Sequence, residues 1–361
     1  MFRISNTPKT VALLLITALS LASMACSRGA SGNGLATSNI SLQGAGATFP
    51  NPLYQKWLSE YGKQHPNIRI DYQSIGSGGG IKQIQAQTVD FGASDSPMKD
   101  ADLAAAPGEL LHVPTVLGAV VITYNLPGLT QPLSFSPQVI ADIFLGKIKK
   151  WNDPAIKADN PQVSLPTGDV TVVHRSDGSG TSAVFTDYLS KVSSEWKDKV
   201  GSGTSPSWPA GIGGKGNEGV TGQVKQTPNT IGYVELAYAV QNKLPVALVK
   251  NASGNFIEPS IDAVTAAAAG SAANTPDDLR VSITNAAGAT AYPISSYTYI
   301  LVYKNQKDAA KGRALVDFLW WGIHDGEQYA TELRYAPLPQ DIVKRAEAKI
   351  NAITADGKSL R

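Results

Sequence analysis

Residues 175–182 read Arg-Ser-Asp-Gly-Ser-Gly-Thr-Ser and follow a valine-rich stretch at 170–173. The pattern indicates a strand that runs into an arginine, then a glycine-punctuated turn, then a helix rich in Ala, Val, Phe and Leu. This order places a cation, two hydroxyls and free backbone N–H groups at one helix N-terminus. Because the first N–H groups of a helix lack intrahelical partners and carry partial positive charge, such a terminus favours an anion.

Two further segments have the same character. Residues 44–50 read Gly-Ala-Gly-Ala-Thr-Phe-Pro, and residues 75–80 read Ile-Gly-Ser-Gly-Gly-Gly. Each precedes a predicted helix, at 51–61 and at 80–88. Ligands of α/β sheets lie beyond the carboxyl ends of strands, close to helix starts. Three glycine-rich helix starts in one chain therefore predict one small anion held between them.

Short strands and helices alternate along the chain, which indicates an α/β fold with mixed, mainly parallel sheets. A long buried strand is expected at 113–124, interrupted at Pro114 and Gly118. The region from about Ile40 to Ile353 is longer than one typical domain. Other strands are predicted at 40–42, 68–72, 89–95, 170–173, 230–234 and 297–303, and other helices at 138–145, 182–192, 219–224, 309–321 and 325–333.

Residues 1–25 read as a secretory signal peptide, because a basic start precedes an apolar run from Val11 to Leu21 that is too short to span a membrane. Cys26 is the only cysteine, so no intramolecular disulfide can form. A lone cysteine directly after a signal resembles the acylated first residue of a bacterial lipoprotein, although residues 23–25 also suit an ordinary signal peptidase. We expect lipidation of Cys26 and a flexible tether over 26–39, which is rich in Ser, Gly, Ala and Asn.

The charges of the chain are balanced. It has 31 basic and 29 acidic residues, and the predicted signal contains two of the basic ones, Arg3 and Lys9, and no acidic one. The remainder is therefore neutral overall, which gives no support for nucleic acid or a bilayer as the main partner. Affinity for an anion must come from local dipoles and hydrogen bonds.

Four residues in the first half of the chain are candidates for the anion site. Thr48, Phe49 and Ser77 offer hydroxyl and backbone N–H donors at helix starts, although Thr48 and Ser77 could instead be ordinary capping residues. Asp95 ends a predicted strand, where an Asx turn is the alternative. A carboxylate suits an anion site only if the anion carries a proton that the carboxylate can accept, which a fully ionised sulfate cannot offer.

The segment that opens at Arg175 supplies the other candidates. Arg175 presents a planar fork of donors suited to an oxyanion, and Asp177 could hold that guanidinium in place. Ser179, Gly180 and Thr181 add hydroxyl and N–H donors at the next helix start. The alternative is a surface ion pair of little energetic value.

Other motifs do not indicate a cofactor or a metal. Residues 211–216 fit G-x-G-x-x-G but follow Trp208-Pro209 and not a strand, so a dinucleotide site is not expected. Four scattered histidines and one cysteine form no metal-ligand spacing. We expect no catalytic residue; a phosphate-ester hydrolase with Ser179 or Thr181 as nucleophile and His174 as base is the enzymatic alternative.

Six motifs occur in order across about residues 40–350. They are 44–50, 76–80, 91–95, 145–151, 175–182 and 213–217. Together they resemble the periplasmic phosphate-binding proteins of ABC-type phosphate importers. One departure is Gly79, where some relatives carry serine.

The resemblance implies a two-lobed periplasmic binding protein of type II with a hinge. Residues 40–117 and 291–361 would form lobe I, and residues 118–290 lobe II. Carried over by motif, Asp177 would orient Arg175. The phosphate contacts would be Thr48, Phe49, Ser77 and Asp95 from lobe I, and Arg175, Ser179, Gly180 and Thr181 from lobe II.

The expected function is capture of inorganic phosphate on the outer side of the cytoplasmic membrane and its delivery to an ABC permease. The expected protein is a monomer, periplasmic or anchored through Cys26. The alternatives are a binding protein for sulfate or molybdate, against which Asp95 argues, and a phosphate-scavenging surface protein without a permease.

Overall fold

The computed structural model describes residues 39–361. The predicted signal peptide, Cys26 and all of the predicted tether except Asn39 lie outside the described residues. None of the helices in the described range is long and apolar enough to cross a membrane.

A mixed eight-stranded sheet organises the described region, with the strand order β2-β1-β3-β11-β4-β8-β6-β7. Pairs among β1, β2 and β3 and among β6, β7 and β8 are parallel, whereas every pair that involves β4 or β11 is antiparallel. The α/β class and the mixed sheet are thus confirmed. The strands are β1 (Ile40–Gly46), β2 (Ile68–Ser74), β3 (Phe91–Ser94), β4 (Leu110–Asn125), β6 (Thr171–Arg175), β7 (Ile212–Gly214), β8 (Thr230–Glu235) and β11 (Ser295–Tyr303).

Strand β4 changes its neighbour halfway along. Residues 110–119 pair with β11, and residues 120–125 pair with β8. All but the last of its residues are buried, which agrees with its nearly continuous apolar sequence. The strand therefore links the half of the sheet around β1 to the half around β6.

The predicted interruption of this strand at Pro114 and Gly118 is wrong. The ladder shifts register where Thr298 pairs with Val116 and Tyr299 with Pro114. This irregularity accommodates a proline, which lacks the N–H that a regular ladder needs.

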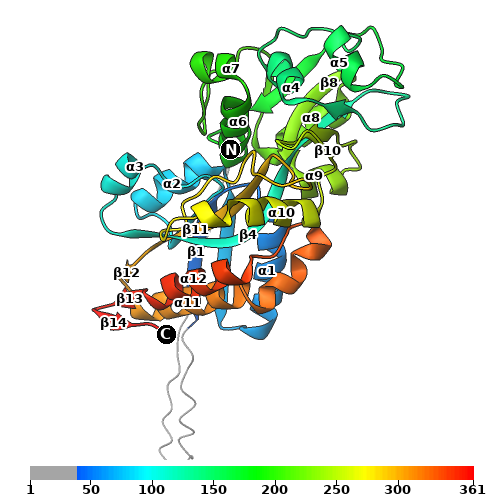
Figure 1. The fold of residues 1–361 in the computed structure, drawn as a ribbon. Coiled ribbons are helices and arrows are strands. Elements are labelled where there is room, and N and C mark those ends of the chain that lie inside the picture. Colours follow the sequence, from blue (N-terminus) through cyan, green and yellow to red (C-terminus); the bar gives the residue numbers. More distant parts are fainter. Residues whose placement is uncertain (1–38) are drawn as a thin grey trace, which may run out of the picture. The chain divides into compact units, whose positions relative to one another are not determined.

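Helices cover the sheet; near the C-terminus, α11 packs against the N-terminal strand β1 and α12 against β4 (Figure 1). The spacing predicts that helix α1 buries Leu53, Trp57, Leu58 and Tyr61. Three of these are buried together with Tyr54, whereas Leu58 is half-buried. Trp57 donates from Nε1 to Gly326 O at 2.8 Å. The helices of at least eight residues are α1 (Asn51–Gln64), α2 (Ser77–Gln85), α4 (Pro137–Phe144), α6 (Gly180–Val192), α8 (Gly216–Gln226), α10 (Ile261–Ser271), α11 (Ala309–Gly322) and α12 (Gln340–Asn351).

The remaining elements are short. Two three-stranded sheets, β10-β9-β5 and β12-β13-β14, complete the described strands. The helix predicted at 325–333 consists of two 3₁₀ helices. The short elements are α3 (Asp100–Ala104), α5 (Pro154–Asp159), α7 (Ser194–Lys199), α9 (Leu236–Gln241), η1 (Ala272–Asn274), η2 (Asp325–Tyr329), η3 (Thr331–Leu333), β5 (Ser134–Phe135), β9 (Leu248–Lys250), β10 (Phe256–Ile257), β12 (Asn305–Gln306), β13 (Thr354–Ala355) and β14 (Lys358–Ser359).

Candidate anion-binding site

Arg175 ends strand β6, and its guanidinium is fixed from two sides. Nε and Nη2 donate to the two carboxylate oxygens of Asp177 at 2.7 and 2.5 Å, and Nη1 donates to Thr181 Oγ1 at 3.2 Å. The Arg175 side chain is 1% exposed, so the pair is not a surface ion pair. Burial would raise the pKa of Asp177, but the Arg175 guanidinium and the Gly216 N–H hold it below its usual value.

Helix α6 begins earlier than predicted, directly at the proposed anion contacts. Ser179 is its N-cap and accepts a hydrogen bond from Ser182 N at 3.0 Å. Gly180 and Thr181 fall in the first turn, whose N–H groups have no intrahelical acceptor. All three residues are buried.

Asp95 follows β3 and meets the start of α2. Its Oδ1 accepts from Thr298 Oγ1 at 2.8 Å, and Oδ2 from Ser77 Oγ at 3.3 Å. A Cβ on Gly180 would lie 2.3 Å from Ser77 Oγ and 2.5 Å from Asp95 Oδ2, so only glycine lets the α6 backbone approach this closely. Burial raises the pKa of Asp95 to about 7, although hydrogen bonds and the charge of Arg175 act to lower it.

Thr48 and Phe49 lie in the turn between β1 and α1. An amide from the start of α8 ties this turn to α6: Asn217 Nδ2 donates to Thr48 Oγ1 at 2.7 Å and to Thr181 Oγ1 at 3.1 Å. Both Thr48 and Phe49 are buried. The turn at Thr48 therefore lies next to the start of α6 at Gly180, although the two are far apart in the sequence.

The glycine-rich turns at 76–80 and 175–182 touch directly. Gly78 N donates to Gly178 O at 2.8 Å. Gly76 has φ +87, and a Cβ there would lie 2.3 Å from Asp177 Oδ2. At Gly79 a Cβ would meet only the side chain of Ile75, so this position is less restricted.

The structure thus brings together every described residue that the sequence predicts for the site. One connected set of contacts holds hydroxyl groups, the starts of α1, α2 and α6, one guanidinium and two carboxyl groups, of which Asp177 is paired with Arg175. This set can donate several hydrogen bonds to a small anion and accept one proton from it. Its members are Thr48, Phe49, Ser77, Asp95, Arg175, Asp177, Ser179, Gly180 and Thr181.

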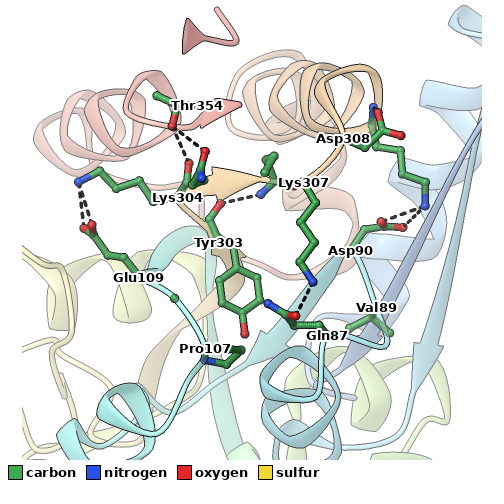
Figure 2. Close-up of a pocket in the computed structure, with 14 residues that line it drawn as sticks. Gln87, Val89, Asp90, Pro107, Glu109, Tyr303, Lys304, Lys307, Asp308 and Thr354 are labelled. Carbon is green, nitrogen blue, oxygen red and sulfur yellow. Dashed lines mark hydrogen bonds and ion pairs between the residues drawn. The ribbon is translucent and has the colours of Figure 1, made fainter. Parts of the chain in front are cut away.

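A separate cavity of about 720 Å³ lies near β12 and the start of α11 (Figure 2). Three lysines line it, but each has an acceptor from the protein: Lys304 bonds Glu109, Lys307 bonds the side-chain amide oxygen of Gln87, and Lys311 bonds Asp90. None of the predicted anion contacts lines this cavity.

Comparison with known proteins decides the family. A family model described as the PBP superfamily domain matches residues 30–320. The phosphate-binding protein PstS of Xylella fastidiosa is 48% identical over 313 residues, which cover 86% of this chain and 85% of that protein. The chain belongs to the PstS family of phosphate-binding proteins. A PstS from Methanocaldococcus jannaschii is 40% identical over 339 residues, covering 88% and 87% of the two chains.

Solved structures show the fold of this PstS-family chain. The structure of a high-affinity periplasmic phosphate-binding protein bound with phosphate has a TM-score of 0.67 at 21% identity and covers 86% of this chain and 93% of that one. The phosphate-binding protein of Stenotrophomonas maltophilia has the same score and identity, with 88% and 96% covered. The two-lobed type II fold is thereby confirmed.

Several residues around the candidate anion site escaped prediction from the sequence. Asn217 belongs to the motif at 213–217, but the sequence did not predict that its amide would join Thr48 to Thr181. Tyr233 Oη accepts from the backbone N–H of Arg175 at 3.1 Å, and Thr298 fixes Asp95. Glu235, at the end of β8, is wholly buried. The signal that could have found Glu235 is its place at a strand end in an otherwise apolar segment.

Proposed function

We propose that this chain captures inorganic phosphate outside the cytoplasmic membrane and delivers it to the permease of an ABC importer. The observation that carries the proposal is the convergence of three distant glycine-rich helix starts on one guanidinium and one carboxyl group. The names of the PstS relatives support phosphate as the ligand.

The chemistry of the site favours a protonated tetrahedral anion. Backbone N–H groups of the Thr48–Phe49 turn and of the starts of α2 and α6 would donate to phosphate oxygens. The hydroxyls of Thr48, Ser77 and Thr181 and the guanidinium of Arg175 would donate as well. Asp95 would accept the hydrogen bond of a protonated phosphate oxygen. Sulfate has no proton at neutral pH, so it would leave two negative oxygens facing each other, a mismatch that can cost about 10⁴-fold in binding.

The hydrolase alternative lacks support from the geometry. This alternative requires His174 as the general base. His174 Nδ1 instead lies 3.0 Å from Arg175 O, and the imidazole ring stacks on Trp208 with centroids 4.9 Å apart. Ser179 Oγ is engaged as the cap of α6. We therefore propose a binding protein without catalytic activity.

The proposed lobes are 40–117 with 291–361, and 118–290. The change of partner along β4 between Ala119 and Val120 supports a boundary in this strand. Each lobe would supply half of the phosphate contacts, so phosphate would favour a closed arrangement. We further propose a periplasmic monomer held to the membrane through Cys26, which lies outside the described residues.

Isothermal titration of the purified, phosphate-stripped protein tests the proposal. Phosphate should bind with a dissociation constant of about 1 μM or tighter, corresponding to about −8 kcal/mol. Sulfate should bind far more weakly, and a chromogenic phosphate ester should not turn over. Equal affinity for the two anions, or no binding of phosphate, would refute the proposal.

A further inference from the structure

Two tyrosines hold the backbone of the turn that contains Thr48 and Phe49. Tyr238 Oη donates to Thr48 O at 2.6 Å, and Tyr335 Oη donates to Phe49 O at 2.6 Å. Thr48 O and the Phe49 N–H belong to one planar peptide unit, so fixing the oxygen fixes the direction of the N–H. That N–H is one of the proposed phosphate donors.

Glu235 lies behind Tyr335. The carboxyl oxygen Oε2 is 3.1 Å from Tyr335 Oη and accepts from Ala237 N at 2.8 Å. The phenol of Tyr335 has a single proton to donate. It donates this proton to Phe49 O, because that contact is the shorter one and a carbonyl oxygen can only accept. A proton on the Glu235 carboxyl group completes the longer contact, with Glu235 as donor and Tyr335 as acceptor.

The surroundings of Glu235 oppose a negative charge. The side chain is wholly buried, and Oε1 has no hydrogen-bond partner among the described residues. Burial raises its pKa well above the usual value, and the charge of Asp95 acts in the same direction. Glu218 makes a similar 3.0 Å contact with Tyr238, but Glu218 is exposed, so water solvates its carboxylate.

The backbone of Glu235 reaches the same site by a second route. Glu235 N donates to Asn217 Oδ1 at 2.9 Å, which fixes the orientation of the Asn217 amide. The amide nitrogen then faces Thr48 Oγ1 and Thr181 Oγ1. One residue at the end of β8 is thus linked to proposed phosphate contacts on both sides of the site.

We propose that Glu235 is a positioning residue of the phosphate site: its protonated carboxyl group, through Tyr335, holds the Phe49 carbonyl of the turn that carries Thr48 and Phe49. Its backbone N–H, through Asn217, aligns the hydroxyls of Thr48 and Thr181. The inference rests on the proposed function. Glu235 has no phosphate contact of its own, so it acts on affinity only through the alignment of other groups. An uncharged side chain that keeps one of the two carboxyl contacts should therefore cost less affinity than an apolar side chain that keeps neither.

Three variants test this by phosphate titration. Glu235→Gln is uncharged and keeps one of the two contacts that Oε2 makes, either as an acceptor for Ala237 N–H or as a donor for Tyr335 Oη, so its dissociation constant should rise only by about threefold. Glu235→Leu loses both and should weaken phosphate binding by about tenfold or more. Tyr335→Phe removes a single oxygen and with it the contacts to Phe49 O and Glu235; it should weaken binding by a similar factor, and its melting temperature is measured alongside.

A matched control is Glu327, a half-buried carboxyl group that accepts from Leu338 N but lies outside the site. Glu327→Gln and Glu327→Leu should leave phosphate affinity unchanged. Glu235→Leu combined with Tyr335→Phe should lose little more than either single change, because both act on one contact.

The outcomes separate this inference from the proposed function. If wild type fails to bind phosphate, the proposed function fails. If wild type binds and Glu235→Gln loses as much affinity as Glu235→Leu, then Glu235 acts as a charged group and the inference is overturned. Full affinity in Glu235→Leu and in Tyr335→Phe would also overturn it.

Discussion

The sequence contains two Arg-x-Asp pairs whose arginines lie on strands, and the two pairs differ in their exposure and in their surroundings. Arg69 and Asp71 lie on β2 at the edge of the sheet, with the arginine side chain 77% exposed. Arg175 and Asp177 lie at the carboxyl end of β6 and beyond it, with the arginine side chain 1% exposed. The residues and their spacing are the same, yet only the second pair is surrounded by helix starts and hydroxyl groups.

The difference shows that a site is made by the environment of a charge. An exposed pair in water is worth at most about 1 kcal/mol and is screened by salt. A buried guanidinium interacts more strongly because water does not compete for it. The glycines at 76–80 and 178–180 provide that burial, because they let two turns meet without side chains between them.

Removal of each arginine gives the largest expected contrast. Arg175→Ala should weaken phosphate binding by about a hundredfold or more, because charge-assisted hydrogen bonds are each worth roughly 1.5–3 kcal/mol. The matched variant Arg69→Ala should bind phosphate like wild type. Titration calorimetry measures both; a similar loss in the two variants would show that long-range charge, not the local site, drives binding.

Thr48→Ala should cost less than Arg175→Ala, because it removes one neutral hydroxyl from a turn that keeps its backbone N–H groups. We expect a loss of about tenfold. An equal loss in the two variants would contradict a dominant guanidinium. Asn217 would lose one of its acceptors, so the melting temperature of the variant should be measured alongside its affinity.

Asp95 has no counterpart near Arg69, and its replacement tests selectivity. Asp95→Asn should weaken phosphate binding and narrow its advantage over sulfate, because an amide no longer repels an unprotonated oxygen. Competition titration with both anions measures the ratio. An unchanged ratio would exclude Asp95 as the acceptor of the phosphate proton.

Asp95 should also make the stability of the phosphate-free protein depend on pH. Its pKa in the fold is about 7, above the ordinary value of 3.8. The folded state therefore binds more protons than the unfolded state between these values, and stability falls as pH rises from about 4 to about 7. The free energy of unfolding measured in urea should therefore fall less between pH 4 and pH 7 for Asp95→Asn than for wild type. Parallel pH profiles for the two proteins would contradict the assignment.

The lysine-lined cavity of Figure 2 should give the smallest effect. Its lysines resemble Arg69, since each is partly exposed and already paired. Simultaneous replacement of Lys304, Lys307 and Lys311 by alanine should change phosphate affinity by less than about twofold at physiological salt. A larger loss would mean that this surface contributes to phosphate capture.

The sequence predicted much of the site because its main contacts come from short local patterns. A strand end, a glycine turn and a hydroxyl at a helix start can be recognised without knowledge of the fold, as at Arg175 and Ser179. The order of the motifs then indicated the family. Local patterns also located the long buried strand, although not its continuity through Pro114.

The missed residues owe their roles to contacts between distant parts of the chain. Asn217 bonds Thr48 across 169 positions, and Tyr335 bonds Phe49 across 286. Nothing near Glu235 in the sequence indicates Tyr335 as its neighbour. The bulge opposite Pro114 likewise depends on its pairing with β11. Such roles follow from packing, and an isolated sequence segment does not contain them.

A crystal structure of the protein grown with phosphate tests the central claim most directly. The account predicts one phosphate ion that contacts the Thr48–Phe49 turn, Ser77 and Asp95 on one side and Arg175 with the first turn of α6 on the other. A phosphate ion bound instead among Lys304, Lys307 and Lys311, with Arg175 contacting no anion, would contradict the account.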